Sequence, residues 1–213
     1  EAIRDEILKY EKESGNISGL ATYSPAVVRG TAWSTLNLMS YMVLYHNYRK
    51  KFPFLTSLTD KIPNLTTVTI SILSPDTEIK PHYGDTNGVI RVHLGLIVPD
   101  PYPLVGMKVG GEDTGWKEGE LLLFTIVQQH SVWNKSDKKR YLLLLDFVPK
   151  VLEYRQKEIC TKTLGSQTFI FLYKRSAVFR SLPEPVVQFL CFTLTQMWRV
   201  LLPIQRKINL GFP

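Results

Sequence analysis

Apolar and polar residues alternate with a period of two along the middle of the chain. The runs with this pattern cover residues 67–73, 89–98, 105–109, 120–127 and 141–148. The segments between them are rich in Gly, Pro, Asp and Asn, which favour turns. Because no helical pattern lies between these runs, they predict antiparallel strands rather than a parallel α/β sheet. We therefore expect a mainly β fold, built as a sandwich or a barrel.

The first third of the chain has a helical pattern instead. Residues 3–13 predict a charged amphipathic helix that ends at Gly15, and residues 35–50 predict a second helix before Pro53. The charged start of the chain does not have the pattern of a signal peptide. We expect these helices to cover one side of the sheets.

The end of the chain is unusually apolar. Residues 185–198 contain no charged side chain and are followed by three basic residues, Arg199, Arg206 and Lys207. The uncharged stretch is shorter than the roughly 20 residues that span a bilayer. It predicts either a helix packed on the domain, or a helix that lies in the plane of a membrane or contacts a partner through residues 185–204.

Composition and charge narrow the class of protein. The chain has 213 residues, of which 44% are hydrophobic and 21% charged, and these values exclude a disordered, collagen-like or coiled-coil protein. We expect a domain over residues 1–152, with a core at 67–150, and a helical extension over 153–213. Cys160 and Cys191 lack the spacing of a zinc site and fit a reducing compartment, although an isolated disulfide stays open. The expected location is the cytoplasm, free or at a membrane.

The formal charge of +7 favours anionic partners such as a phospholipid surface, a nucleic acid or an acidic substrate. The basic residues are scattered along the sequence, and no aromatic-rich strand accompanies a basic groove. We therefore expect no nucleic-acid partner.

Candidate metal ligands fall in the β-rich centre of the chain. His82 lies at a strand end in the segment IKPHYG, and His130 follows the apolar run ELLLFTIV. Imidazole binds Fe(II) well, and β-barrels commonly hold iron with two histidines and a carboxylate. Spacing alone also allows two unrelated histidines.

Two arginines are candidates for binding a carboxylate. In VIRVHLGLIV, alternation places Arg91 and His93 on the face opposite the packing residues, toward a cavity or solvent. Arg140 opens a run of four leucines, where a guanidinium could clamp a carboxylate with two hydrogen bonds. The alternative for Arg140 is an exposed arginine at the end of the basic run KKR.

These segments together resemble the aspartyl/asparaginyl β-hydroxylase family. The resemblance rests on PHYGDTNGVIRVHLGLIVP, GWKEGELLLF, QHSVW and the Arg140 strand, and extends weakly upstream to Trp33. It implies a double-stranded β-helix, a jelly-roll or cupin-like barrel, with flanking N- and C-terminal helices. It also implies a dioxygenase that uses Fe(II), 2-oxoglutarate and O2.

The resemblance assigns roles to individual residues. It makes His82 and His130 the iron ligands and Arg140 the clamp for the distal carboxylate of 2-oxoglutarate. Ser71 matches a hydroxyl that supports the clamp, and Arg91 and His93 match an R-x-H pair that lines the cosubstrate and substrate pocket. Trp33 is matched to a tryptophan of that pocket through a loose alignment.

The sequence departs from related oxygenases at two places. Many of them carry a carboxylate two residues after the first histidine, where this chain has Gly84. The β-hydroxylase family likewise lacks that carboxylate, so we expect two histidine ligands with water in the third position, and Asp85 as the alternative ligand. Thr125 stands where the family often has an acidic residue.

The resemblance implies hydroxylation of an unactivated C–H bond, most simply the β-carbon of an Asp or Asn side chain in a peptide or small molecule. Arg91 could then hold a substrate carboxylate. A second branch hydroxylates lipid A acyl chains, and the apolar C-terminal segment with the positive charge suits such an enzyme. A catalytically silent β-barrel binding module is the third possibility, but the presence of both histidines together with Arg140 argues against it.

Overall fold

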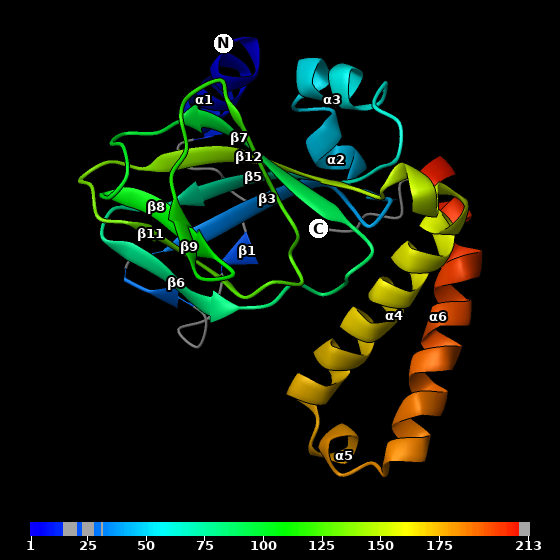
Figure 1. Cartoon of the computed structure of the whole chain (residues 1–213). Helices are drawn as coiled ribbons and strands as arrows, with labels where there is room; N and C mark the ends of the chain where they lie inside the picture. The colour runs from blue at the N-terminus through cyan, green and yellow to red at the C-terminus, as the bar shows by residue number, and fades with distance from the viewer. Residues whose placement is uncertain (15–20, 23–27, 31, 209–213) are drawn as a thin grey trace.

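Two antiparallel sheets face each other and form the body of the molecule (Figure 1). The computed structural model describes residues 1–14, 21–22, 28–30 and 32–208. The major sheet contains, in spatial order, β1 (Ala21–Thr22), β3 (Trp33–Ser40), β5 (Leu65–Leu73), β12 (Arg140–Phe147), β7 (Ile90–Ile97) and β10 (Leu121–Phe124), with β4 (Val43–Leu44) paired to β3. The minor sheet contains β2 (Val28–Arg29), β6 (Thr77–His82), β11 (His130–Asn134), β8 (Val105–Val109) and β9 (Glu112–Thr114). The mainly β, cupin-like barrel with helices at both ends is thereby confirmed.

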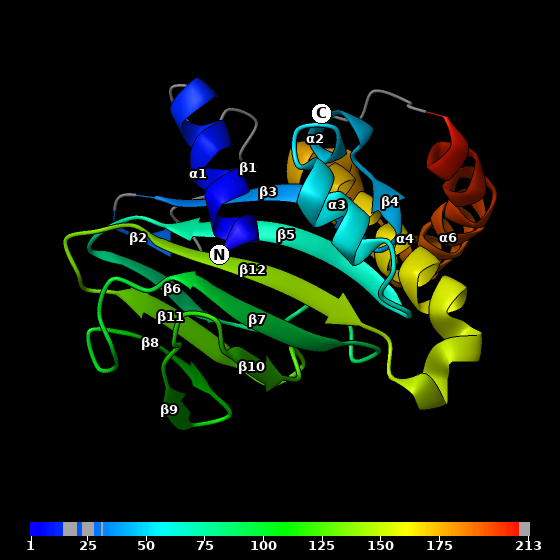
Figure 2. The same ribbon diagram turned by 90° about the horizontal axis from the view of Figure 1, so that it is seen from above.

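Helices cover the outer face of the major sheet (Figure 2). They are α1 (Ala2–Ser14), α2 (His46–Arg49) and α3 (Pro53–Thr59). Ile7 of α1 and Leu55 of α3 are buried there together with Leu36 and Leu38 of β3, and this cluster forms the outer core. The helix predicted over residues 3–13 is confirmed.

A second core fills the space between the two sheets. Leu142 and Leu144 of β12 point into this inner core, whereas Leu143 and Leu145 belong to the outer core. The four consecutive leucines thus serve both faces of one strand, which is why β12 is apolar without alternation.

The helix predicted over residues 35–50 is wrong. That segment forms β3, a turn, β4 and the short helix α2. Leu36 and Leu38 are fully buried in the outer core, and Thr35 and Asn37 alternate with them along the strand, so the period is two. Tyr41 and Met42 have positive φ values of 45° and 70°, which make the tight turn between β3 and β4. The apolar residues of this segment have helical spacing, but the segment forms a strand because pairing with the neighbouring strand β5 outweighs the local helical preference.

The C-terminal part is a helical hairpin. After the short 3-10 helix η1 (Lys150–Arg155), it contains α4 (Gln156–Arg175), α5 (Ala177–Arg180) and α6 (Glu184–Lys207). α4 and α6 run side by side, with α5 at the far end of the pair (Figure 1). Cys160, Leu164 and Leu202 form a third apolar cluster with Tyr41 and Val43. The hairpin is therefore packed on the end of the barrel near β4.

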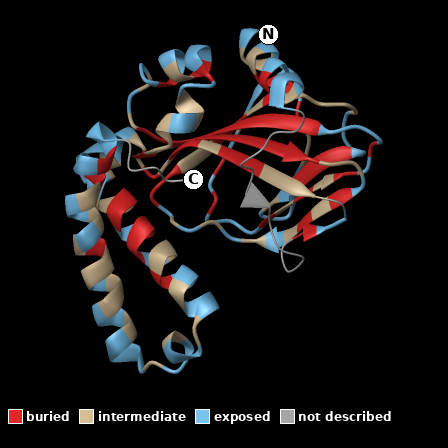
Figure 3. Cartoon of the chain, turned by 180° about the vertical axis from the view of Figure 1, so that it is seen from behind, coloured by how far each residue is buried: buried red, intermediate tan, exposed pale blue. Residues whose placement is uncertain are grey.

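The two arms of the hairpin approach closely at one glycine. A Cβ at Gly165 would lie 2.6 Å from Oγ1 and 2.9 Å from the backbone nitrogen of Thr195. Buried residues concentrate in the half of α4 nearer the barrel, while the far half of the hairpin is mostly intermediate or exposed (Figure 3). Both cysteines are free, so the isolated disulfide left open by the sequence does not form.

Candidate active site

Strand pairing brings the two predicted iron ligands together. His82 at the end of β6 lies directly opposite His130 at the start of β11, and their ring centroids are 4.2 Å apart. Nδ1 of His82 lies 2.8 Å from the carbonyl of Lys80, and Nδ1 of His130 lies 2.9 Å from that of Gln128. A carbonyl can only accept, so each Nδ1 carries the proton. Both Nε2 lone pairs are thereby left to bind a cation.

The electrostatic surroundings keep His130 neutral. Burial, together with the positive potential of His82 and Arg91, lowers the pKa of His130 to about 4, although its hydrogen bond to Gln128 opposes the shift. At neutral pH this imidazole does not have to lose a proton before it binds a metal.

The position of a third ligand is occupied by an apolar side chain. A Cβ at Gly84 would lie 2.5 Å from Cδ1 of Ile126, so no carboxylate fits there. Asp85 faces elsewhere: Gln167 of α4 donates a 2.8 Å hydrogen bond to its carboxylate, and the hydroxyl of Tyr41 donates a longer one. Within the described part of the chain, no group of three or more His, Cys, Asp or Glu side chains is placed to hold a metal. This arrangement favours two protein ligands.

Arg140 is a buried cation with unused donors. Its side chain is 1% exposed and its guanidinium carbon lies 4.7 Å from the ring centroid of Trp116. Nη2 donates a 3.4 Å hydrogen bond to Oγ of Ser71, while Nε and Nη1 have no partner among the residues that the structure describes. Burial lowers the pKa of Arg140 to about 9, which leaves it charged at neutral pH. The predicted clamp is therefore inside the barrel, and not at an exposed strand end.

Ser71, which lies beside Arg140, also has a hydrogen-bond donor available for a ligand. Its Oγ accepts hydrogen bonds from Trp33 Nε1 at 3.1 Å and from Arg140. Because a hydroxyl has two acceptor lone pairs and one donor, only its hydrogen is left, and this hydrogen must point to an acceptor. Trp33, Ser71 and Arg140 thus form one hydrogen-bonded group, and their roles in cosubstrate binding stay predictions.

His93 adds another donor to the interior. Trp116 Nε1 donates a 3.2 Å hydrogen bond to Nδ1 of His93, which places the proton of His93 on Nε2. That buried Nε2 also has no partner within the described residues. Burial first, and then the charges of Arg91 and Arg140, lower the pKa of His93 well below its usual value, so the ring is neutral.

The site residues form a closed circuit of neighbours. Arg140 contacts Trp116, Trp116 contacts His93, and His93 lies 5.0 Å from Phe124. Phe124 in turn lies 5.3 Å from His130, and Trp33 lies 6.5 Å from His82. The Trp33–Ser71–Arg140 hydrogen bonds close the ring. One side of this ring carries the Nε2 atoms of the two histidines, and the other carries donors without a partner among the described residues, which suit an anion.

Arg91 lies near the site but is already paired. Its Nε and Nη2 donate hydrogen bonds of 2.7 Å and 2.8 Å to the fully buried carboxylate of Asp146 on β12. This ion pair reduces the capacity of Arg91 to hold a substrate carboxylate. Thr125 is exposed and donates a 3.2 Å hydrogen bond to Gln128, in the turn that leads to His130.

Sequence reasoning missed three residues of the site, Trp116, Phe124 and Asp146. Trp116 lies in a loop rich in Gly and charged residues, yet it is 4% exposed, and a tryptophan in such a loop was the available signal. The loop reaches the interior by crossing β7 at Gly95, where a Cβ would lie 2.3 Å from the carbonyl oxygen of Lys117. Asp146 gave a signal too, as the one acidic residue in an apolar strand.

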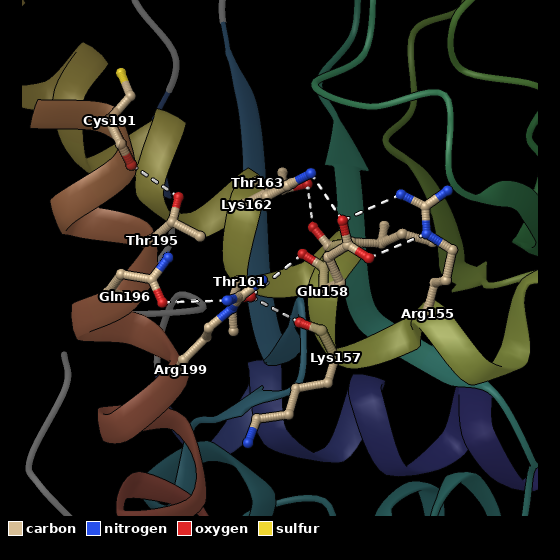
Figure 4. Close-up of polar contacts among 11 residues, drawn as sticks. Arg155, Lys157, Glu158, Thr161, Lys162, Thr163, Cys191, Thr195, Gln196 and Arg199 are labelled. Atoms are coloured by element: carbon tan, nitrogen blue, oxygen red, sulfur yellow. Dashed lines mark hydrogen bonds and ion pairs between the residues drawn. The ribbon is translucent and has the colours of Figure 1, made fainter. Parts of the chain in front are cut away.

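A cleft of about 650 Å³ opens between the loop after His82 and the start of the helical hairpin. Val127, Leu152 and Ile159 contribute apolar parts of its lining, and charged side chains of η1 and α4 lie among them. Glu158 accepts hydrogen bonds or ion pairs from Arg155 at 3.0 Å and Lys162 at 2.7 Å (Figure 4). These contacts lower the pKa of Glu158 to about 2. The cleft therefore suits a ligand with both polar and apolar parts.

Comparison with known proteins agrees with this geometry. A family model described as aspartyl/asparaginyl beta-hydroxylase matches residues 1–149. An ornithine lipid ester-linked acyl 2-hydroxylase of Rhizobium tropici is 34% identical over 144 residues, which are 68% of this chain and 51% of that protein. The aspartyl/asparaginyl beta-hydroxylase of Homo sapiens is 31% identical over 121 residues, which are 54% of this chain and 15% of that protein. The chain thus matches about half of the first relative and a smaller part of the second.

Among solved structures, a predicted oxalate decarboxylase of Thermotoga maritima has a TM-score of 0.41 and 13% identity, over 61% of this chain and 92% of that one.

Proposed function

The chain belongs to the aspartyl/asparaginyl β-hydroxylase family, a family of hydroxylases, and from this premise we propose that it is an Fe(II)- and 2-oxoglutarate-dependent dioxygenase that hydroxylates an unactivated C–H bond. One observation carries the proposal. A buried arginine with unused donors lies in the same ring of residues as two histidines whose Nδ1 atoms donate to carbonyls, which leaves their Nε2 atoms to bind a metal.

The donor set fits both groups that the reaction needs. Two imidazole Nε2 atoms suit Fe(II), which accepts nitrogen ligands readily and leaves positions for other ligands. Arg140, Ser71 and His93 provide only donors, and their natural partner is a carboxylate, which only accepts. Bound Fe(II) would supply the activation of O2 that protein side chains cannot provide.

The protein's own residues have distinct tasks in this proposal. His82 and His130 hold the metal, and the carbonyls of Lys80 and Gln128 fix the orientation of both rings. Arg140 and Ser71 bind the distal carboxylate of 2-oxoglutarate, and Trp33 orients Ser71. The surrounding apolar inner core excludes water from the reacting groups.

The cleft favours an amphiphilic substrate, such as the acyl chain of a lipid. Its apolar lining includes Val127, three residues before His130, together with Leu152 and Ile159, and most of its charged residues lie on η1 and α4. The acyl 2-hydroxylase from Rhizobium tropici supports this class of substrate. An Asp or Asn side chain of a peptide or small molecule is the second candidate, supported by the human relative. This second class of substrate needs a cation that binds the substrate carboxylate, but Arg91, the candidate for that role, is already paired with Asp146.

Slow turnover without substrate provides the first test. Purified protein with Fe(II), 2-oxoglutarate and O2 should release succinate, and omission of Fe(II) should abolish the release. His82→Ala and His130→Ala should each lose anaerobic Fe(II) binding, which we expect at about one ion per chain with two histidine ligands. Unchanged iron binding in both variants would contradict the ligand assignment, and a protein that binds neither iron nor 2-oxoglutarate would be a silent binding module.

A second assay distinguishes the lipid class of substrate from the peptide class. Membrane lipid extracts and Asp- or Asn-containing peptides are offered in parallel, and succinate release above the uncoupled rate is measured with mass analysis for added oxygen. A gain of one oxygen in an acyl chain supports the lipid class, and a gain in the peptide alone supports the other.

A further inference from the structure

The helix α6 lies on the outside of the molecule, with α4 between it and the barrel (Figure 1). Its inner side is occupied: Trp198 Nε1 donates a 2.9 Å hydrogen bond to Thr168 of α4, and Thr195 packs against Gly165. Its C-terminal end is held to the turn around β4, where Gln205 exchanges hydrogen bonds with the backbone of Leu44. α6 is therefore fixed in place and has one free side.

That free side is apolar. Exposed hydrophobic residues recur along α6 at spacings of three, four or eight, which places them on one face of the helix. We call this face the outer stripe; it consists of Val186, Phe189, Met197, Val200 and Ile204, which are between 39% and 64% exposed. Because α6 is apolar on both sides and only one side is packed, the outer stripe needs another surface to cover it.

A spanning orientation does not suit the helix. Among the described residues, α6 is the one helix long and apolar enough to cross a bilayer, and 11% of its most apolar window is buried. Its partner α4 contains Lys157, Glu158 and Lys162, which could not enter the hydrocarbon with it at low cost. An orientation parallel to the membrane surface exposes only the outer stripe to the acyl chains.

The net positive charge of the chain is concentrated in its C-terminal part, which contains α6. Residues 159–213 contain seven Lys or Arg and one Glu, so they carry six of the seven net positive charges. Among them, Arg199 and Lys207 of α6 and Lys174 and Arg175 of α4 are exposed. Such side chains are long and flexible enough to extend their charged ends to lipid phosphates.

We propose that the outer stripe of α6 docks into the interface of an anionic bilayer, with these cations at the headgroup level. The combination of an apolar stripe and flanking cations is the pattern of an interfacial helix. A second copy of the chain fits less well, because pairing two such faces would bring like charges together. The inference does not depend on the iron site.

The test compares two double variants of the full chain by flotation with vesicles. Phe189→Asp plus Val200→Asp places two negative charges in the stripe at residues that are each 64% exposed, so the fold should persist. Leu121→Asp plus Leu123→Asp makes the same change on β10, at residues 60% and 62% exposed, and is the matched control. Melting curves check that both remain folded.

We expect the wild-type chain to bind phosphatidylcholine vesicles that contain about 30% phosphatidylglycerol, with binding weakened by high salt but not abolished. The α6 double variant should bind at least about tenfold more weakly, and the β10 double variant should bind like the wild type. Lys174→Gln plus Arg175→Gln should reduce binding by about fivefold or more.

Three outcomes would overturn the proposal. They are a wild-type chain that ignores anionic vesicles at low salt, equal losses in the two Asp double variants, and a wild-type dimer that only the α6 variant converts to a monomer. The last result would assign the stripe to contact between two copies. Fe(II) binding and succinate release are measured on the same samples, so a failure of docking is distinguishable from a failure of the proposed activity.

Discussion

At the scale of single residues, the barrel interior has more donors than acceptors. Arg140 Nε and Nη1 and His93 Nε2 lack partners among the described residues, while the carboxylate of Asp146 is already engaged by Arg91. A buried guanidinium without a counter-ion is costly, and an anionic ligand would relieve that cost. The interior is thus suited to a bound anion.

Loss of Arg140 should therefore weaken 2-oxoglutarate binding strongly. Arg140→Ala removes a buried, charge-assisted contact, which typically costs about 2–5 kcal/mol, or about 30-fold or more in affinity. Ser71→Ala should cost about 1 kcal/mol, or roughly fivefold. The measurement is the dependence of succinate release on 2-oxoglutarate concentration, with a melting curve for each variant. A change below about threefold in a folded Arg140→Ala protein would show that the clamp lies elsewhere.

The place of a third protein ligand to a bound metal gives a second prediction at the scale of single residues. Asp85→Ala should keep Fe(II) binding, because this carboxylate is held by Gln167 and Tyr41. Gly84→Ala should instead destabilise the fold by about 1–3 kcal/mol, since the new methyl group meets Ile126. Iron binding is measured anaerobically and stability by denaturant titration. If Asp85→Ala lost iron while folded, Asp85 would be a ligand.

At the scale of elements, one carboxylate joins α1 to β12. Glu11 accepts hydrogen bonds from Lys139 at 2.8 Å and from the hydroxyl of Tyr141 at 2.7 Å. Partial burial opposes ionisation of Glu11, but these two hydrogen bonds outweigh it and lower its pKa below the ordinary 4.5. The helix is thus held to the sheet by charge as well as by Ile7 and Tyr10.

This contact should give a pH-dependent contribution to stability. Because the folded pKa of Glu11 is lowered, its contribution is complete above the ordinary pKa and is lost as the pH falls through the folded value. Glu11→Gln should lower the free energy of unfolding by about 1 kcal/mol at pH 7, and the difference from wild type should shrink below about pH 4.5. Urea titrations at several pH values measure this. A pH-independent difference would show that Glu11 acts through packing.

At the scale of the whole molecule, the hairpin and the barrel stabilise each other. Leu202 of α6 completes the cluster around Tyr41 and Val43, and Arg206 donates a 3.1 Å hydrogen bond to the carbonyl of Met42. The cleft after the His82 strand has one wall on the barrel and one on η1 and α4. The extension predicted from residue 153 onward therefore contributes to the surroundings of the site.

Separating the two arms should reduce the stability of the whole chain. Gly165→Ala forces the new methyl group against the backbone of Thr195 and should cost about 1–3 kcal/mol. Truncation after Arg175 should cost more, because it uncovers Leu164 and the β4 end of the barrel. Thermal melts with light scattering measure both effects. A truncated chain that melts like the full chain would mean that the hairpin is an independent appendage.

The sequence alone determined the barrel and most of the site. Period-two alternation predicted the strands that contain Ser71 and His93, because the side chains of a strand point alternately to its two faces. The family motifs then identified residues that the structure does bring into one ring, although their roles in iron and 2-oxoglutarate binding stay predictions.

Tertiary structure decided what depends on distant partners. Residues 35–50 became strand, turn and short helix because β5 offered pairing that a local pattern cannot reveal. Whether Arg140 was exposed or buried depended on Trp116, 24 residues earlier and brought in by the close crossing at Gly95. Burial, hydrogen-bond partners and pKa shifts are properties of the folded surroundings, which is why the pairing of Arg91 with Asp146 and the free face of α6 appeared only in the structure.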